Sequence, residues 1–118
     1  MSSTRVLLVE DESLVALAME DMLADLGCEV VASFGALAPA MSWLAERNRA
    51  VDGALLDVNL SGELVFPLAE ALEAKGVPFV FATGYGALPG ERFPGAMVIR
   101  KPVDLARLGA ALETFARA

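Results

Sequence analysis

The sequence predicts an α/β fold in which helices cover a parallel β-sheet, and three observations support this expectation. Short apolar runs alternate with helical patterns of about 10–15 residues, as in chains built from βαβ units. The hydrophobic fraction is 56%, much of it alanine, which suits helices packed closely on a sheet. Polar residues follow directly after several of the apolar runs. At 118 residues the chain can bury one core, so we expect a single domain over residues 1–118.

The first predicted strand covers residues 5–10 and precedes a long helix. This helix is expected over 12–26, and Gly27 is its stop, because glycine readily adopts the left-handed conformation that ends helices. Apolar residues recur near helical spacing along the segment and are expected to face the sheet: Leu14, Leu17, Ala18, Met22 and Leu26.

The second unit begins with a predicted strand over 29–33. A helix is expected to start at Pro39, because proline is favoured in the first turn of a helix, where its missing N–H costs nothing. Met41 and Leu44 are expected to face inward from this helix. The next apolar run predicts a strand over 53–57.

The third helix is bounded by two residues that interrupt helices. Pro67 cannot lie deep inside a helix, so the helix is expected to begin at Phe66 or Pro67 and to leave 61–65 as a loop. Gly76 ends the helix, and the apolar run that follows predicts a strand over 78–83.

The last part of the chain begins with segment 84–95, which is rich in glycine and proline. A helix within this segment would therefore be short or broken. A strand is expected over 96–100, and Asp104 is the expected N-cap of a final helix. One stripe of this helix is apolar at helical spacing: Leu105, Leu108, Leu112 and Phe115.

Charge and composition exclude several classes of function. The balance of 9 basic and 16 acidic residues gives a net charge of −7, which argues against direct binding to nucleic acid or to anionic membranes. The chain has no histidine, which removes the commonest zinc ligand and the commonest general base. No apolar run approaches the ~20 residues of a membrane span, and we expect no secretory signal before the first strand. With Cys28 as its lone cysteine, the chain is expected to be cytoplasmic and free of internal disulfides.

Side chains that could bind a ligand or react lie at the ends of four of the predicted strands. Glu10 and Asp11 close the first, Asp57 the third and Thr83 the fourth, and Lys101 follows the fifth. In an open parallel sheet, ligands bind at the carboxyl ends of the strands, so these scattered side chains are expected to meet. Clustered carboxylates need a cation, and Mg²⁺ is the hard divalent ion that they favour. Each residue alone has an ordinary structural role, and the set as a whole indicates a site.

Together these residues resemble the receiver domain of two-component response regulators, over essentially the whole chain. The resemblance rests on four motifs: Val9-Glu10-Asp11-Glu12, Asp57, Thr83 and Lys101-Pro102. Their order, spacing and common position at strand ends make the set specific. The resemblance implies a flavodoxin-like (βα)5 three-layer sandwich with a parallel sheet of order 2-1-3-4-5.

The resemblance also implies a function and a role for each residue. Asp57 is the phosphoacceptor, which takes a phosphoryl group from a phosphohistidine of a sensor histidine kinase or a histidine phosphotransfer protein. Thr83 and Lys101 contact the phosphoryl oxygens, and the bond from Lys101 to Pro102 is cis. The expected Mg²⁺ ligands are Glu10, Asp11, Asp57 and the backbone carbonyl of Asn59. Such a domain is a signalling module rather than an enzyme, and it regulates a downstream protein target.

The chain departs from the family pattern at Val98. Receivers usually carry Tyr or Phe three residues before the lysine, and that ring swings inward when the threonine engages phosphate. Valine has no ring, and Phe81-Ala82-Thr83-Gly84-Tyr85 resembles a subgroup that has a Phe-Ala-Thr-Gly motif and no aromatic switch. We therefore expect segment 84–95 to move on phosphorylation, with Tyr85 as the ring that reorients.

Two other functions remain open from the sequence. One is a receiver-like interaction module that works without phosphorylation. Val98 favours this alternative, whereas the intact acidic pair, Asp57, Thr83 and Lys101 argue against it. The other is a Mg²⁺-dependent hydrolase of similar fold, which the chain disfavours because it leaves no room for a substrate-capping insertion. A homodimer also remains open, through arginines that pair with acidic residues across a dimer face: Arg92, Arg100, Arg107 and Arg117.

Overall fold

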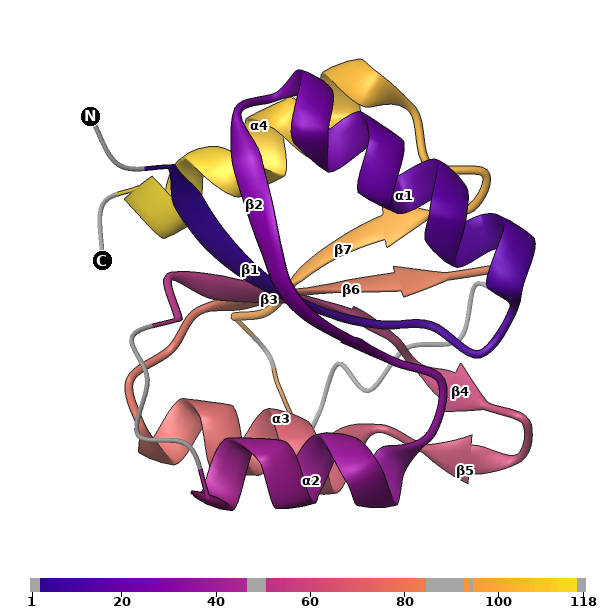
Figure 1. Ribbon diagram of the computed structural model, residues 1–118, viewed down its shortest axis with the longest axis vertical. Helices are drawn as coiled ribbons and strands as arrows, with labels where there is room; N and C mark the ends of the chain where they lie inside the picture. Colours follow the sequence, from indigo (N-terminus) through magenta and orange to yellow (C-terminus); the bar gives the residue numbers. More distant parts are fainter. Residues whose placement is uncertain (1–2, 47–50, 85–92, 94, 117–118) are drawn as a thin grey trace.

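The computed structural model describes residues 3–46, 51–84, 93 and 95–116. Its central sheet has five parallel strands in the order β2-β1-β3-β6-β7 (Figure 1). In chain order the strands are β1 Thr4–Val9, β2 Cys28–Phe34, β3 Gly53–Asp57, β6 Phe79–Thr83 and β7 Met97–Arg100. Counted along the chain within this sheet, the order is 2-1-3-4-5, so the predicted flavodoxin-like sheet is confirmed.

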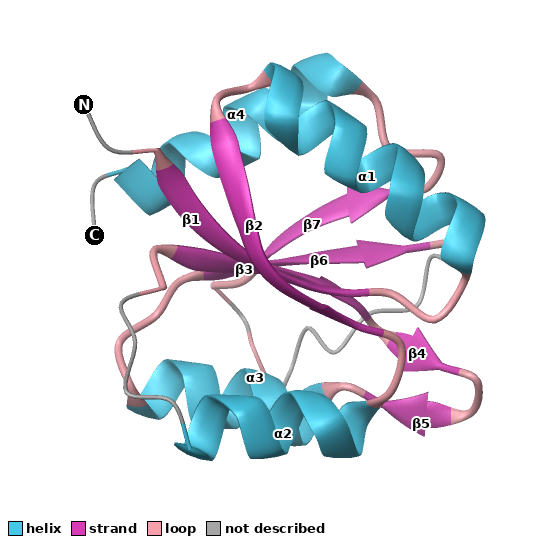
Figure 2. Cartoon of the chain, in the orientation of Figure 1, coloured by secondary structure: helices cyan, strands magenta, loops and turns pink. Residues whose placement is uncertain are grey.

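Helices cover both faces of the sheet and complete a three-layer sandwich (Figure 2). One face carries α1 Ser13–Asp25 and α4 Leu105–Ala116. The opposite face carries α2 Leu37–Glu46 and α3 Phe66–Ala74. Within the described residues the helices lie over the two faces of the sheet, and the polar residues of the sequence motifs lie at one end of its strands.

The sheet divides the hydrophobic core into two clusters, because side chains alternate between the two faces along each strand. Along β3, Ala54 and Leu56 belong to the cluster under α2 and α3, whereas Leu55 belongs to the cluster under α1 and α4. Gly53 lies against the ring of Phe115 from α4, so a Cβ atom at this position would overlap the ring. All 5 residues of β3 are buried, which makes this strand the centre of the fold.

The inward face of α1 differs in part from the predicted one: Met22 and Leu26 pack against the core as expected, but the other predicted residues do not. Leu14 and Leu17 are 81% and 56% exposed and Ala18 is also exposed, whereas Met19 and Leu23 are buried. Apolar residues occupy more than one face of this alanine-rich helix, so their spacing is compatible with two helix orientations. Packing on the sheet buries Met19 and Leu23 and leaves Leu14 and Leu17 exposed to solvent.

The final helix follows its predicted stripe except in its first turn. Leu108, Leu112 and Phe115 are buried as expected. Leu105 is 43% exposed, and the prediction that it faces the core is wrong. Every residue of 104–107 is exposed, so this first turn does not pack against the sheet.

Helix boundaries agree closely with the residues that were expected to set them. Gly27 and Gly76 follow α1 and α3 with φ of 82° and 74°, the left-handed conformation that ends helices. Helix α2 begins at Leu37, earlier than the predicted start at Pro39. Pro39 still lies in the first turn, where a backbone N–H has no acceptor within the helix, so the earlier start costs no hydrogen bond.

Residues 61–65, which were expected to form a loop, lie largely in a small antiparallel hairpin. In it, β4 Asn59–Leu60 pairs with β5 Glu63–Leu64. The turn residues Ser61 and Gly62 have φ of 57° and 97°, and a two-residue type I′ turn requires positive φ at both positions. Strands of two residues are too short to show any periodicity, so the sequence pattern does not reveal them.

Some expectations concern residues outside the described ones. They are the motion of most of segment 84–95, the reorientation of Tyr85, and the placement of Arg92 and Arg117. Among the described helices, none has the length and apolar character that crossing a membrane demands.

Candidate functional site

The carboxyl ends of β1, β3, β6 and β7 lie level at one edge of the sheet. The register shows this, since the paired residues there are Val9 with Leu56, Asp57 with Ala82, and Thr83 with Arg100. In the described part of the chain, the polar or charged residues that are buried are Glu10, Asp57 and Thr83, and all three lie at this edge. Burying polar groups costs free energy unless they find partners, so their concentration here indicates a functional site.

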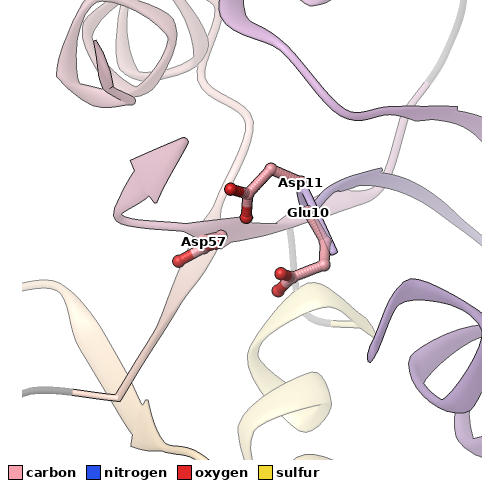
Figure 3. Close-up of side chains that lie close together, drawn as sticks. All are labelled: Glu10, Asp11 and Asp57. Carbon is pink, nitrogen blue, oxygen red and sulfur yellow. The ribbon is translucent and has the colours of Figure 1, made fainter. Parts of the chain in front are cut away.

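Glu10, Asp11 and Asp57 form a cluster of carboxylates (Figure 3). One oxygen from each lies within 4.8 Å of one from the others. The backbone N–H of Glu12 donates to Oε2 of Glu10 at 3.2 Å, and that of Asn59 donates to Oδ1 of Asp57 at 3.4 Å. The structure therefore brings together acidic residues that lie far apart in the sequence.

Lys101 supplies positive charge to this cluster. Its Nζ lies 2.8 Å from Oε1 of Glu10 and 3.3 Å from Oδ2 of Asp57. Its backbone N–H donates to the carbonyl of Thr83 at 2.9 Å, which joins the end of β7 to the end of β6. The peptide bond from Lys101 to Pro102 is cis, as expected. One ammonium group thus contacts two of the clustered carboxylates.

Burial, hydrogen bonds and neighbouring charges shift the pKa values of the site. Burial of Asp57, its hydrogen bond with Asp11 and the charge of Glu10 raise the pKa of Asp57 to about 7, against the opposing effect of Lys101. The hydrogen bond from Ser61 is the main reason that the pKa of Asp11 is lowered. Burial alone would lower the pKa of Lys101, but the contact of its ammonium with the Glu10 carboxylate and the charges of Asp57 and Glu10 raise it. A nearby cation would therefore stabilise the charged form of Asp57.

Similarity to solved structures identifies the family. The structure of SdrG from Sphingomonas melonis Fr1 is 38% identical, with 98% of this chain and 99% of that chain covered and a TM-score of 0.84. A response regulator receiver protein from Sinorhizobium medicae WSM419 is 27% identical, with 98% of this chain and 96% of that chain covered and a TM-score of 0.84. This chain belongs to the response regulator receiver family. The BeF3-activated conformation of SdrG from Pseudomonas melonis Fr1 is 37% identical to this receiver, with 95% of each chain covered and a TM-score of 0.78. Neither protein-family profiles nor curated proteins match it.

The acidic cluster of this receiver fits a divalent cation. It sets three carboxylates against the single ammonium of Lys101. Oε1 of Glu10 is buried and accepts no hydrogen bond of good geometry, even though the ammonium faces it at 2.8 Å. A buried oxygen in this condition can take a further electrostatic partner. Carboxylate oxygens are the ligands that Mg²⁺ prefers, so donor type and charge both suit this ion.

The receiver carries its aromatic rings beside position 98 rather than at it. Val98 is partly buried and pairs with Phe81 in the sheet register. Nearby rings pack with centroid separations between 5.3 and 6.1 Å, and they belong to Phe66, Phe79, Phe81 and Phe93. Several of these pairs adopt the edge-to-face geometry that aromatic rings prefer. Val98 packs against this same hydrophobic cluster.

Ser61 contacts the acidic cluster, although the sequence motifs do not point to it. Its hydroxyl donates a hydrogen bond of 2.6 Å to Oδ2 of Asp11. The only sequence signal is the Ser61-Gly62 pair, because Ser-Gly dipeptides are typical of turns. The hairpin turn connects the segment that follows Asp57 with the end of β1.

An open cavity of about 280 Å³ adjoins the acidic cluster on the side of α1. Its lining includes Glu10, Asp11 and the exposed Leu17. Leu14 is exposed on the same helix, where no described residue buries it. This side of the site therefore presents apolar side chains next to carboxylates.

Proposed function

We propose that this receiver accepts a phosphoryl group on Asp57 from a phosphohistidine. The position of Asp57 is the observation that supports this most directly, since it lies within 4.8 Å of its acidic neighbours and 3.3 Å from Nζ of Lys101. An oxygen of the Asp57 carboxylate attacks phosphorus, so a P–O bond forms and the P–N bond to the imidazole breaks. The electron pair of that bond leaves on the imidazole nitrogen, which then takes up a proton.

Two negatively charged groups meet in this reaction, and the receiver offsets their repulsion. Bound Mg²⁺, held by Glu10, Asp11, Asp57 and the carbonyl of Asn59, would supply charge neutralisation for the phosphoryl oxygens. Lys101 transfers its contact from the Asp57 carboxylate to the arriving phosphoryl group, for which a compact ammonium is well suited. Thr83 donates its hydroxyl to the same oxygens at the end of β6.

The donor is a histidine kinase or a histidine phosphotransfer protein. The exposed Leu14 and Leu17 support a protein donor, because apolar side chains beside a reactive site suit a protein–protein contact. A small phosphodonor would gain nothing from them. Since such donors work in the cytoplasm, we place the receiver there.

The receiver acts as a signalling domain rather than an enzyme. Phosphorylation shifts an equilibrium between two conformations, and a downstream protein binds one of them more tightly. The BeF3-activated conformation of the similar SdrG supports such a transition.

The test is an intact-mass measurement after incubation with acetyl phosphate, with and without Mg²⁺. We expect a single phosphoryl adduct on the wild type that requires Mg²⁺, and none on Asp57→Asn. Asp25→Asn changes an exposed aspartate at the end of α1 and is the matched control, which should be phosphorylated like the wild type. An adduct that persists on Asp57→Asn would contradict the assignment of the acceptor.

If acetyl phosphate leaves no adduct, beryllofluoride distinguishes the remaining functions. NMR shift changes around Asp57 on adding beryllofluoride and Mg²⁺ would indicate a receiver that takes phosphoryl groups only from its kinase. An unchanged spectrum would instead favour the phosphorylation-independent interaction module.

A further inference from the structure

We propose that Ser61 positions Asp11 for Mg²⁺ and thereby helps to set the affinity of the receiver for this ion. The inference rests on the proposed function, in which the ion takes part in phosphoryl transfer to Asp57. Its starting point is the hydrogen bond from Oγ of Ser61 to Oδ2 of Asp11, at 2.6 Å. This short distance is typical of a hydroxyl that donates to an ionised carboxylate.

Asp11 is the least restrained carboxylate of the cluster. Glu10 and Asp57 are buried and both lie in ion pairs with Lys101. Asp11 is partly exposed, and the other side chains that act on it within the described chain, Glu10 and Asp57, are carboxyl groups like itself. The hydrogen bond between Asp57 and Asp11 needs a shared proton, whereas Mg²⁺ binds the ionised carboxylates. Once both groups are ionised they repel, so the Asp11 carboxylate is favoured to turn toward water unless another donor holds it. Ser61 is a neutral donor in the position to do so.

The hairpin brings the Ser61 hydroxyl to Asp11. Ser61 has φ of 57°, and Gly62 after it has φ of 97°. Oδ1 of Asn59 accepts the N–H of Gly62 at 2.6 Å, which closes the turn just after Asp57. Glycine adopts positive φ more readily than serine does. What serine adds at this position is therefore its hydroxyl, and that hydroxyl contacts a candidate metal ligand.

The hydrogen bond limits how the Asp11 carboxylate can rotate and so reduces the cost of ordering it when a cation binds. Groups that hold metal ligands in this way commonly change metal affinity by about 10–100-fold. Ser61 is exposed and water can replace part of its effect, so we expect a smaller change, of about 3–10-fold.

The experiment measures Mg²⁺ binding directly by isothermal titration calorimetry on the wild type, Ser61→Ala and Ser61→Gly. Both variants lose the hydroxyl, but they affect the backbone in opposite ways. Alanine retains the unfavourable positive φ without its hydrogen bond and should lower Tm, whereas glycine relieves the backbone and should lower Tm less or raise it. If the hydroxyl positions Asp11, both variants should bind Mg²⁺ about 3–10-fold more weakly, whatever their Tm.

A second readout uses acetyl phosphate at increasing Mg²⁺ concentrations. The concentration for half-maximal phosphorylation should rise by the same factor in both variants, and the maximal rate should stay within about 2-fold of the wild type. Wild-type Mg²⁺ affinity in both variants would overturn the inference. So would a loss of Mg²⁺ affinity that appears only in Ser61→Ala, together with its lower Tm. Failure of the wild type itself to bind Mg²⁺ would instead count against the proposed function, and with it the role of Ser61.

Discussion

The Nζ of Lys101 lies 2.8 Å from Oε1 of Glu10, and Glu10 is only 3% exposed. Separating the two groups would leave a buried charge without its partner, which is strongly unfavourable. The pair therefore holds the lysine side chain at the carboxyl edge of the sheet before any phosphoryl group arrives. In doing so it links the chain after β1 to the chain after β7.

Replacing this lysine should slow phosphorylation and also lower stability, because Glu10 would be left buried without its partner. We expect Lys101→Met to react with acetyl phosphate about 100-fold more slowly, because the variant has no ammonium for the developing charge on the phosphoryl oxygens. The rate is measured by intact mass at fixed Mg²⁺. The matched control is the chain's other lysine, Lys75, which is exposed at the end of α3. If Lys75→Met and Lys101→Met slow the reaction equally, Lys101 has no special role.

The raised pKa of Asp57 predicts a pH-dependent stability. Between its ordinary value of 3.8 and its folded value of about 7, the folded chain keeps a proton that the unfolded chain releases, so stability falls as pH rises through this window. Asparagine does not titrate, so Asp57→Asn does not lose stability in this way. The gain in free energy of unfolding that Asp57→Asn gives over the wild type should be greater at pH 8 than at pH 5 by about 2 kcal/mol. Urea unfolding with EDTA at the two pH values measures the difference. The same effect at both pH values would mean that the pKa is not raised.

The contact between Gly53 and Phe115 predicts a strong steric effect. Gly53→Ala should destabilise the receiver by about 2–3 kcal/mol, because the added methyl group meets the buried ring. Phe115→Leu makes room, so the double variant should lose less than the sum of the single changes. Gly95→Ala is the control, since nothing lies within 4 Å of a Cβ at that position. Strict additivity in urea unfolding would rule out the steric coupling.

The exposed leucines of α1 should matter to a protein donor and not to folding. We expect Leu14→Ser with Leu17→Ser to change the free energy of unfolding by less than about 0.5 kcal/mol. Phosphotransfer from a kinase or phosphotransfer protein that is active on the wild type should slow about 10-fold more than reaction with acetyl phosphate.

Met97→Ser serves as the control for that comparison. Met97 is 41% exposed but lies at the start of β7, and the acidic cluster lies at the opposite edge of the sheet. An equal loss of phosphotransfer in Met97→Ser would indicate a nonspecific effect of removing surface apolar groups.

The convergence of the site could be predicted from the sequence because few physical rules determine it. Each strand is a distinct apolar run, and all strands of a parallel sheet end at the same edge. Any polar residue directly after such a run, as Glu10, Asp57 and Lys101 are, must then lie near the others. The sheet order and the cis bond at Pro102 were also anticipated, through resemblance to receivers.

The errors arose where local sequence admits more than one arrangement. In α1 an alanine-rich helix has apolar residues on both sides, and only packing on the sheet buries Met19 and exposes Leu14. The hairpin that carries Ser61 consists of strands too short for a periodic pattern. Its contact with Asp11 depends on a turn conformation and on a partner 50 residues away in the chain, which sequence spacing does not report.

Asp57 is the last residue of β3, a strand that is buried throughout and paired along both edges. Backbone amides in such a strand exchange their hydrogens with solvent only when most of the molecule unfolds. The proposed phosphoryl group would thus be attached to the part of the receiver with the least freedom to move. Whatever a downstream protein detects must be carried by peripheral segments, which can rearrange at a lower cost in free energy. The acceptor would serve as a fixed anchor, and the signal would be expressed away from it.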